Sequence, residues 1–276
     1  MKYYLTLIIA LICNTTFAQS AWTKKKGEIY SQVAFTTIND YNQIFGNPDY
    51  LTERKITDNT FQIYGEYGLT DNTTIIVNLP IKLIKTGSLV NNSTSITNSN
   101  SINSLGNIDI GLKHLLLNKK WIISAQINIE ANTSTFNNSS GIRTGFNAWS
   151  FTPTINIGRS FKNFYAQAFS GVDFRTNNYS TNFRLGGEVG TQPIKRITLI
   201  AFTDIVKSFK DGSYIVPATN QQTALYINNQ EYVAYGLKII GELGKNYGIN
   251  AGFGGAFFGR NVAKSAAITF GVYHSF

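Results

Sequence analysis

The chain has 276 residues, enough for one large all-β domain, and no shift in composition marks a second domain. Charged residues make up only 14% of it, against about a quarter in a soluble globular domain, so much of the surface should face something other than water. No stretch approaches the roughly 18–20 consecutive apolar residues of a membrane helix, which leaves alternating strands as the way to cover apolar surface.

The N-terminal residues predict a cleaved signal peptide over 1–18. Cys13 offers a lipoprotein alternative, but the bulky Ile12 stands where a lipobox needs a small residue. We therefore predict export, a short periplasmic segment over 19–27, and a mature chain without cysteine. Because the chain is exported, its formal charge of +9 does not indicate a nucleic-acid partner. The signal features are a basic Lys2, the apolar run Leu5–Ile12 and a Thr16-Phe17-Ala18 site before Gln19.

In about twelve segments of roughly ten residues, apolar side chains alternate with mostly polar ones, as in transmembrane β-strands. In one of the clearest, Ile75, Val77 and Leu79 occupy one face. An even strand number returns both ends to the same side. We therefore predict an all-β, antiparallel transmembrane barrel over 28–276, with both termini periplasmic and no plug domain. The predicted strands lie near 28–38, 59–68, 75–83, 107–116, 121–130, 147–158, 163–175, 182–190, 197–207, 231–242, 247–258 and 265–276.

The connections alternate between short turns and longer loops, which is the pattern of periplasmic turns and external loops in such barrels. One loop, 85–106, consists almost wholly of Asn, Ser, Thr and Gly and reads as a flexible, solvated segment. The short turns are 69–72, 117–120, 159–162, 191–196 and 243–246. The longer loops are 39–56, 85–106, 132–146, 208–230, 176–181 and 259–264.

Aromatic residues near the predicted strand ends indicate two girdles at the membrane interfaces, where outer-membrane lipids would be the partner. The chain ends on an alternating strand that closes at Phe276. A terminal aromatic strand resembles the signal that the barrel-assembly machinery recognises. The clearest interface candidates are Tyr67, Trp121, Trp149, Tyr247 and Phe276.

The inward face carries charges of both signs. Two interpretations stay open: a network of ion pairs that fills a narrow lumen, or a polar path for a solute. Asp173 and Arg184 are expected to lie roughly opposite each other on adjacent strands, across the loop 176–181. The excess of positive charge is expected at the turn-side rim, beginning at Lys24. The candidate lumen-lining residues are Glu66, Lys82, Asp109, Lys113, Glu130, Asp173, Arg175, Arg184, Glu188, Asp204 and Lys238.

The sequence contains no catalytic constellation, so we predict that the chain is not an enzyme. A serine hydrolase needs a histidine beside its nucleophile. The only histidines, His114 and His274, occupy strand positions that are predicted to face outward. Ser275 follows His274 in the strand and therefore points to the opposite face. Two isolated histidines and no mature cysteine also argue against a zinc site. No cofactor is predicted.

The runs Tyr67-Gly68-Leu69-Thr70-Asp71-Asn72, Leu79-Pro80 and Leu105–Lys113 resemble the "meta-pathway of phenol degradation" (MetA-like) family of outer-membrane transporters. This resemblance covers the first half of the barrel. It implies uptake of aromatic or other hydrophobic compounds, with Asp109 and Lys113 facing the lumen. Long-chain fatty-acid transporters fit less well, because about ten mature residues leave no room for their N-terminal hatch.

The leading hypothesis is a passive outer-membrane transporter or narrow channel for small, hydrophobic or aromatic solutes. A structural or adhesive barrel with a sealed lumen is the alternative. A lipid-modifying enzyme is a third, and it would need a nucleophile beside His114 or His274.

Overall fold

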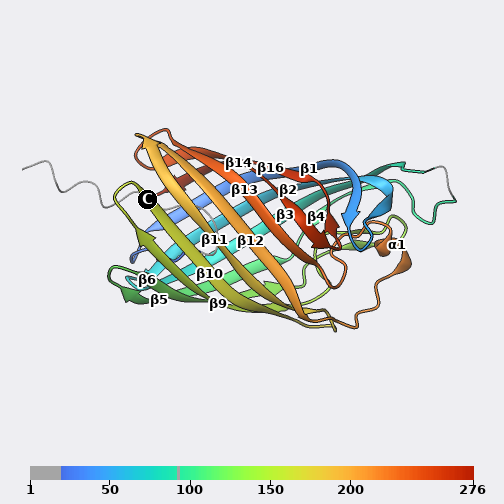
Figure 1. Ribbon diagram of the computed structural model, residues 1–276, viewed down its shortest axis with the longest axis horizontal. Helices are drawn as coiled ribbons and strands as arrows, with labels where there is room; N and C mark the ends of the chain where they lie inside the picture. The colour runs from blue at the N-terminus through green and yellow to red at the C-terminus, as the bar shows by residue number, and fades with distance from the viewer. Residues whose placement is uncertain (1–19, 92–93) are drawn as a thin grey trace, which may run out of the picture.

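The computed structural model describes residues 20–91 and 94–276 as a closed antiparallel β-barrel (Figure 1). The predicted signal peptide lies outside these residues. The wall has 12 strand positions, because β4 and β5 both pair with β3 and share one position. The wall strands are β1 Ile29–Phe45, β2 Tyr50–Thr70, β3 Thr73–Leu89, β4 Asn100–Leu105, β5 Ile108–Asn118, β6 Ile122–Ala131, β9 Ser150–Ser160, β10 Phe164–Arg175, β11 Thr181–Ile194, β12 Ile197–Lys210, β13 Glu231–Glu242, β14 Tyr247–Arg260 and β16 Ala266–Ser275.

The barrel closes because the first strand pairs on both sides. In β1, Tyr30 is opposite Glu66 of β2 and Ser275 of β16. At the same end, Ile29 and Phe276 exchange two backbone hydrogen bonds of 2.6 and 2.9 Å. Closure removes the unpaired edges that an open sheet would expose to lipid.

Side chains alternate as the sequence pattern predicts, with apolar residues outside and polar residues inside. On β6, Ile127 and Ile129 are 45% and 48% exposed, whereas Ser124 and Gln126 are buried. The same outward apolar face runs along β16. This arrangement is the reverse of a water-soluble protein and suits a wall surrounded by lipid.

The wall strands at the loop end run further than the sequence suggested. The predicted loop 39–56 is mostly strand, since β1 continues to Phe45 and β2 begins at Tyr50. The pairing of β1 with β2 shifts register between Ile38 and Tyr41. Such an irregularity breaks the period of two on which the prediction depended. In the predicted loop 85–106, β3 likewise reaches Leu89 and β4 begins at Asn100.

The wall is interrupted beside β4. Among the described residues β4 pairs only with β3, and Gly106 and Asn107 separate it from β5. The segment 132–149 covers the free edge of β4, where another wall strand would otherwise pair. Its Thr144 hydroxyl donates to the carbonyl oxygen of Leu105 at 2.7 Å, and its Thr133 hydroxyl donates to that of Gly106 at 2.5 Å.

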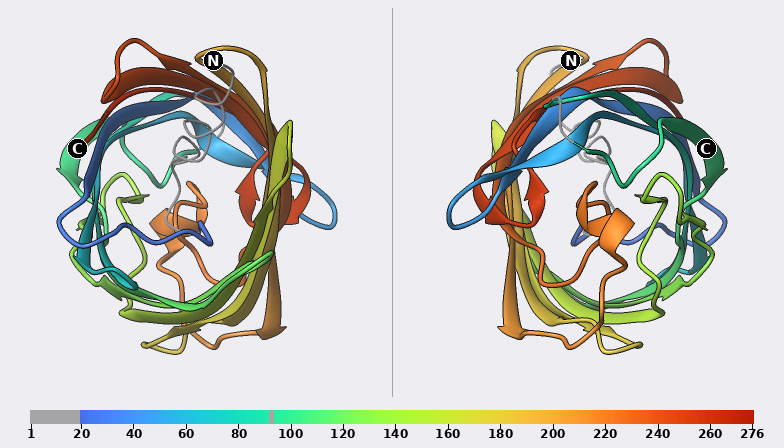
Figure 2. Two further views of the ribbon diagram at one scale, coloured as in Figure 1. Left: turned by 90° about the vertical axis from the view of Figure 1, so that its left-hand side faces the viewer. Right: turned by 90° about the vertical axis from the view of Figure 1, so that its right-hand side faces the viewer.

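Two loops fold into the barrel at the loop end (Figure 2). One carries the two-stranded hairpin of β7 Phe136–Asn137 and β8 Ile142–Arg143, and the other carries the short helix α1 Ala218–Gln221. A further short strand, β15 Val262–Ala263, pairs with the end of β1. No helix within the described residues is long and apolar enough to cross a membrane.

Candidate functional site

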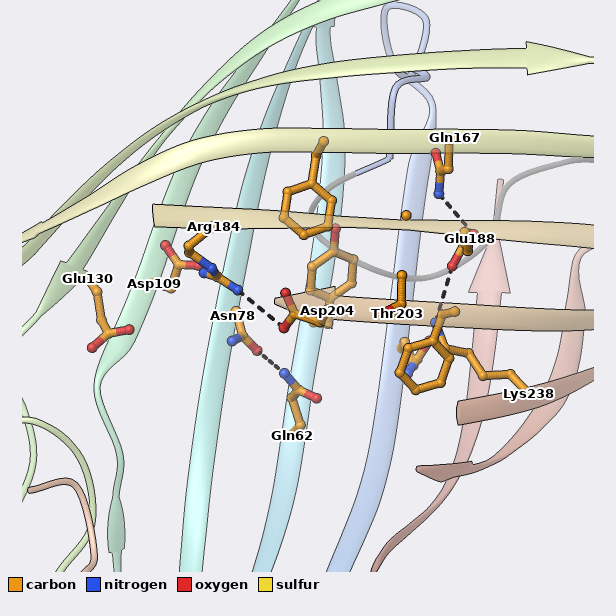
Figure 3. Close-up of a pocket in the computed structure, with 15 residues that line it drawn as sticks. Gln62, Asn78, Asp109, Glu130, Gln167, Arg184, Glu188, Thr203, Asp204 and Lys238 are labelled. Atoms are coloured by element: carbon orange, nitrogen blue, oxygen red, sulfur yellow. Dashed lines mark hydrogen bonds and ion pairs between the residues drawn. The ribbon is translucent and has the colours of Figure 1, made fainter. Parts of the chain in front are cut away.

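A cavity of about 370 Å³ lies inside the lumen (Figure 3). Its wall combines charged groups with neutral amides such as Gln62 and Asn78, and with the rings of Tyr64, Phe169 and Phe202. These side chains come from different strands because each strand directs every second residue inward. We call this cavity the chamber. Its charged lining residues are Asp109, Glu130, Arg184, Glu188, Asp204 and Lys238.

Ion pairs join inward-facing side chains of the same strand, of adjacent strands, or of β11 and β13, which lie on either side of β12. Lys238 lies 3.3 Å from Glu188, and Arg184 lies 3.8 Å from Asp204 (Figure 3). Asp173 pairs with Arg175, two residues further along the same strand, at 2.5 Å. Asp173 and Arg184 lie two register positions apart on adjacent strands, since Asp173 is opposite Asn182 and Arg184 is opposite Gly171, but each forms its ion pair with another residue.

All eleven residues named as lumen candidates project into the barrel. Six line the chamber, and Asp173 with Arg175 lines an adjoining cavity of about 90 Å³. The other three are buried toward the two ends: Glu66 and Lys113 near the turns, and Lys82 near the loops. Charged side chains therefore also lie beyond the chamber, toward both ends of the barrel.

The segment 20–26, which we call the N-terminal stopper, enters the lumen at the turn end. We expected these residues in the periplasm and Lys24 on the rim. Instead the Lys113 ammonium donates to the Trp22 carbonyl at 3.2 Å and lies 3.5 Å from Glu66. The Lys24 ammonium lies 3.8 Å from the same carboxylate. One acid shared by two lysines therefore holds the stopper inside.

Backbone and ring contacts also hold the stopper against the barrel wall. The Lys24 amide donates to Thr74 at 2.8 Å, and the Trp22 ring packs edge-on to Tyr165 at 5.8 Å. Gly158 leaves room for the indole, since a Cβ there would lie 2.8 Å from it. Burial lowers the pKa of the Lys24 ammonium, and the attraction of Glu66 partly opposes that shift.

Residues 136–148 and 214–228, which we call the loop plug, close the other end. Their apolar side chains pack against those of the barrel wall in one buried cluster. The cluster anchors the loop plug on the inner face of β1, β2 and β3, at the loop end of the lumen. Its members are Tyr41, Ile44, Ile56 and Ile84 from the wall, and Ile142, Ala224, Leu225 and Ile227 from the plug.

Polar contacts fix the two loops of the plug to each other. Arg143 donates from Nε to the Asn220 side chain at 3.1 Å, and the Thr223 hydroxyl donates to the Gly141 carbonyl at 2.8 Å. Gly141 has φ +71°, and a Cβ there would lie 2.0 Å from the carbonyl oxygen of Thr219. Only glycine combines this left-handed backbone with such a close approach.

A buried ion pair lies beneath the loop plug. The Lys82 ammonium lies 2.6 Å from Asp58 and 5.4 Å from the centre of the Tyr226 ring. Burial raises the pKa of the Tyr226 hydroxyl, although the Lys82 ammonium partly lowers it. The loop plug therefore rests on a paired charge.

The predicted interface aromatics are exposed on the outside of the barrel near strand ends; they are Tyr67, Trp121, Trp149, Tyr247 and Phe276. The histidines are also exposed. His114 Nδ1 lies 2.9 Å from the Thr73 hydroxyl, and the His274 ring is tilted by 38° against the Phe276 ring, with the ring centroids 4.7 Å apart. Within the described residues neither imidazole contacts a serine hydroxyl, so the hypothesis of a lipid-modifying enzyme gains no support.

Sequence reasoning missed both closures of the lumen. Trp22 stood in a short segment without any periodicity, and Ile142, Leu225 and Ile227 stood in regions assigned to loops. A usable signal was present, because large apolar residues in otherwise polar loops mark burial.

The closed barrel, its apolar outer face and its polar lumen define the architecture of an outer-membrane channel. The model of the family described as "Putative MetA-pathway of phenol degradation" matches residues 49–271. The chain therefore belongs to this family, and the resemblance seen in its first half is confirmed and extends into the second. No curated protein matches the sequence.

Solved structures share the fold at low sequence identity. The COG4313 outer membrane channel from Pseudomonas putida F1 has a TM-score of 0.72 and 12% identity, over 95% of this chain and 100% of that one. The NanC porin has a TM-score of 0.52 and 8% identity, over 90% and 100%. The translocator domain of the autotransporter NalP from Neisseria meningitidis has 0.50 and 10%, over 91% and 87%.

Proposed function

We propose that the protein is an outer-membrane channel for passive passage of small solutes, and that the described conformation is its closed state. The observation that carries this proposal is the polar chamber inside the lumen, with the N-terminal stopper toward one end of the barrel and the loop plug toward the other. Both closures are short segments of the chain outside the wall strands. Their release would open the lumen without breaking the hydrogen-bonded wall.

The solute class we propose is a single aromatic ring with a polar substituent. The rings of Tyr64, Phe169 and Phe202 offer apolar surface to such a solute, and Gln62 and Asn78 offer hydrogen bonds. Binding sites for small molecules commonly combine apolar lining with a few placed polar groups. The family description, which names phenol degradation, supports the same class.

The membrane orientation and export also belong to this proposal. Short turns lie at the end where Ile29 meets Phe276, and longer loops lie at the other. Short turns face the periplasm in barrels of this type. Cleavage of the signal peptide after Ala18, lipid contact at the aromatic girdles and assembly through the strand ending at Phe276 would complete the route.

Single-channel recording of the refolded mature protein in a planar bilayer tests this function. We expect brief openings as a closure is released, and we expect phenol to shorten them reversibly. Cyclohexanol, which keeps the hydroxyl but loses the aromatic ring, is the matched control. Absence of openings at every voltage would contradict passage of solutes through the lumen.

A sealed structural barrel is the second candidate, favoured by the ion pairs inside the lumen and by the two closures. The likeness to an autotransporter domain also shows that this fold is not confined to channels. The same recording separates the two candidates, because a sealed barrel does not open.

A further inference from the structure

We propose that Asp109 and Glu130, together with side-chain oxygens of Gln126 and Thr154, form a lumen subsite for a small primary ammonium group. The subsite would make the channel prefer cations, although the whole chain carries a formal charge of +9. This inference rests on the proposed function only in that a solute must reach the lumen.

The two carboxylates lie side by side on neighbouring strands. Asp109 of β5 is directly opposite Glu130 of β6 in the antiparallel register. Residues paired in this way have Cβ atoms about 4.5–5.5 Å apart, and like charges there are destabilising without a counter-charge. Both side chains line the chamber and also the adjoining 90 Å³ cavity. A ligand in that cavity would meet both acids.

Among the described residues neither acid forms a close ion pair, although Arg184 lies near Asp109 and Arg175 near Glu130. Asp109 accepts two hydrogen bonds from the Asn128 amide, at 2.9 and 2.8 Å, and Glu130 accepts one from Asn107 at 2.7 Å. Neutral amides hold the carboxylates in place but do not cancel their charge. The arrangement therefore fixes two carboxyl groups at the cavity wall.

The neighbouring cations are already paired. Arg175 lies 2.5 Å from Asp173, Arg184 3.8 Å from Asp204, and Lys238 3.3 Å from Glu188. The two cavities together are lined by five acids and three bases, so two acids are in excess. Toward the turn end Lys113 lies on the same strand as Asp109, but its ammonium is bound to Glu66 and to the Trp22 carbonyl.

Unpartnered oxygens in the same cavity provide independent evidence for a ligand. Gln126 of β6 and Thr154 of β9 are paired in the register and only 2% and 5% exposed. Both line the 90 Å³ cavity, and neither Gln126 Oε1 nor Thr154 Oγ1 has a hydrogen-bond partner. Buried acceptors without partners are costly, so a donor is needed there.

The chemistry of these groups matches an ammonium better than a metal ion. A primary ammonium presents three N–H donors, which suit two carboxylates and neutral oxygens. Within the described residues no group of three His, Cys, Asp or Glu side chains could hold a metal. The cavity volume restricts the subsite to the head of the solute, while the chamber accommodates the rest.

Calorimetric titration of the refolded full-length mature protein with methylammonium chloride tests the subsite without requiring conduction. We expect saturable binding, no binding of tetramethylammonium (which lacks N–H donors), and loss of methylammonium binding in the double variant Asp109→Asn, Glu130→Gln. The variant Asp40→Asn, in an exposed ion pair with Lys55, is the matched control and should bind normally. Equal binding of both amines, or binding that survives in the double variant, would overturn the proposal.

Reversal potentials in a KCl gradient test whether the subsite makes the channel prefer cations. We expect openings of the parent protein to favour potassium over chloride, and the double variant to lose that preference. Anion-selective openings, or an unchanged reversal potential in the double variant, would overturn the subsite as the source of selectivity. A protein that never opens but binds methylammonium through Asp109 and Glu130 would contradict the proposed function and leave the subsite standing.

Discussion

The two closures of the lumen depend on different kinds of interaction. The N-terminal stopper depends on a few charged and backbone contacts centred on Glu66, which serves both Lys24 and Lys113. The loop plug depends on a cluster of apolar side chains, in which no single residue is central. A closure held by one shared carboxylate should fail when that group changes, whereas a closure held by many apolar contacts should weaken gradually.

The largest effect is expected from Glu66→Gln. It leaves two buried lysines without their acid, and breaking a buried ion pair in this way costs about 3–5 kcal/mol. We expect a matching loss of stability in urea titration. We also expect trypsin to cleave the released stopper at Lys24, Lys25 and Lys26.

Asp40→Asn is the control for this substitution, because the Asp40–Lys55 pair is exposed at the loop end. Exposed ion pairs contribute about 0–1 kcal/mol to stability. Both the stability in urea and the resistance to trypsin should therefore stay near those of the parent protein. Full trypsin protection in Glu66→Gln would show that charge does not hold the stopper.

An intermediate effect is expected from Gly68→Ala. A Cβ at Gly68 would lie 1.8 Å from the Lys25 carbonyl oxygen, so the stopper must shift. Overpacking of this kind costs about 1–3 kcal/mol. Gly65→Ala on the same strand meets only the Tyr30 carbonyl oxygen, at 3.8 Å, and should be tolerated. Equal trypsin sensitivity in the two variants would contradict the seat described for the stopper.

The smallest effect is expected from Ile227→Val in the loop plug. Removal of one buried methylene costs about 0.5–1.5 kcal/mol, because the remaining cluster still packs. Chymotrypsin cleavage at Tyr226 should rise slightly, while the stopper stays protected from trypsin, since the two sites share no partners. Complete release of the plug by this substitution would refute a graded closure.

The same contrast explains how much of the molecule the sequence predicted. The strand count and the facing of the wall residues follow from a period of two, which needs only local information; Ile127 outside and Gln126 inside are examples. The side of the barrel on which each charge lies is therefore predictable, as Glu188 and Lys238 illustrate.

The partner of each charged side chain was not predictable in this way. Arg175 and Asp204, rather than each other, are the partners of Asp173 and Arg184, because the register places the latter two residues two positions apart. The stopper and the loop plug have no periodicity at all. Their positions depend on packing inside a barrel that exists only once the wall has closed.

The most direct test of the central claim is a comparison of conductance among four proteins: the parent, a variant without residues 20–26, a variant in which a short Gly-Ser linker replaces residues 214–228, and the combination of both changes. Two closures in series predict that each single change raises conductance only slightly, and that the combination exceeds the sum of the two increases. A single change that already gives the conductance of the combination would show that only one closure blocks the lumen, and would contradict the account.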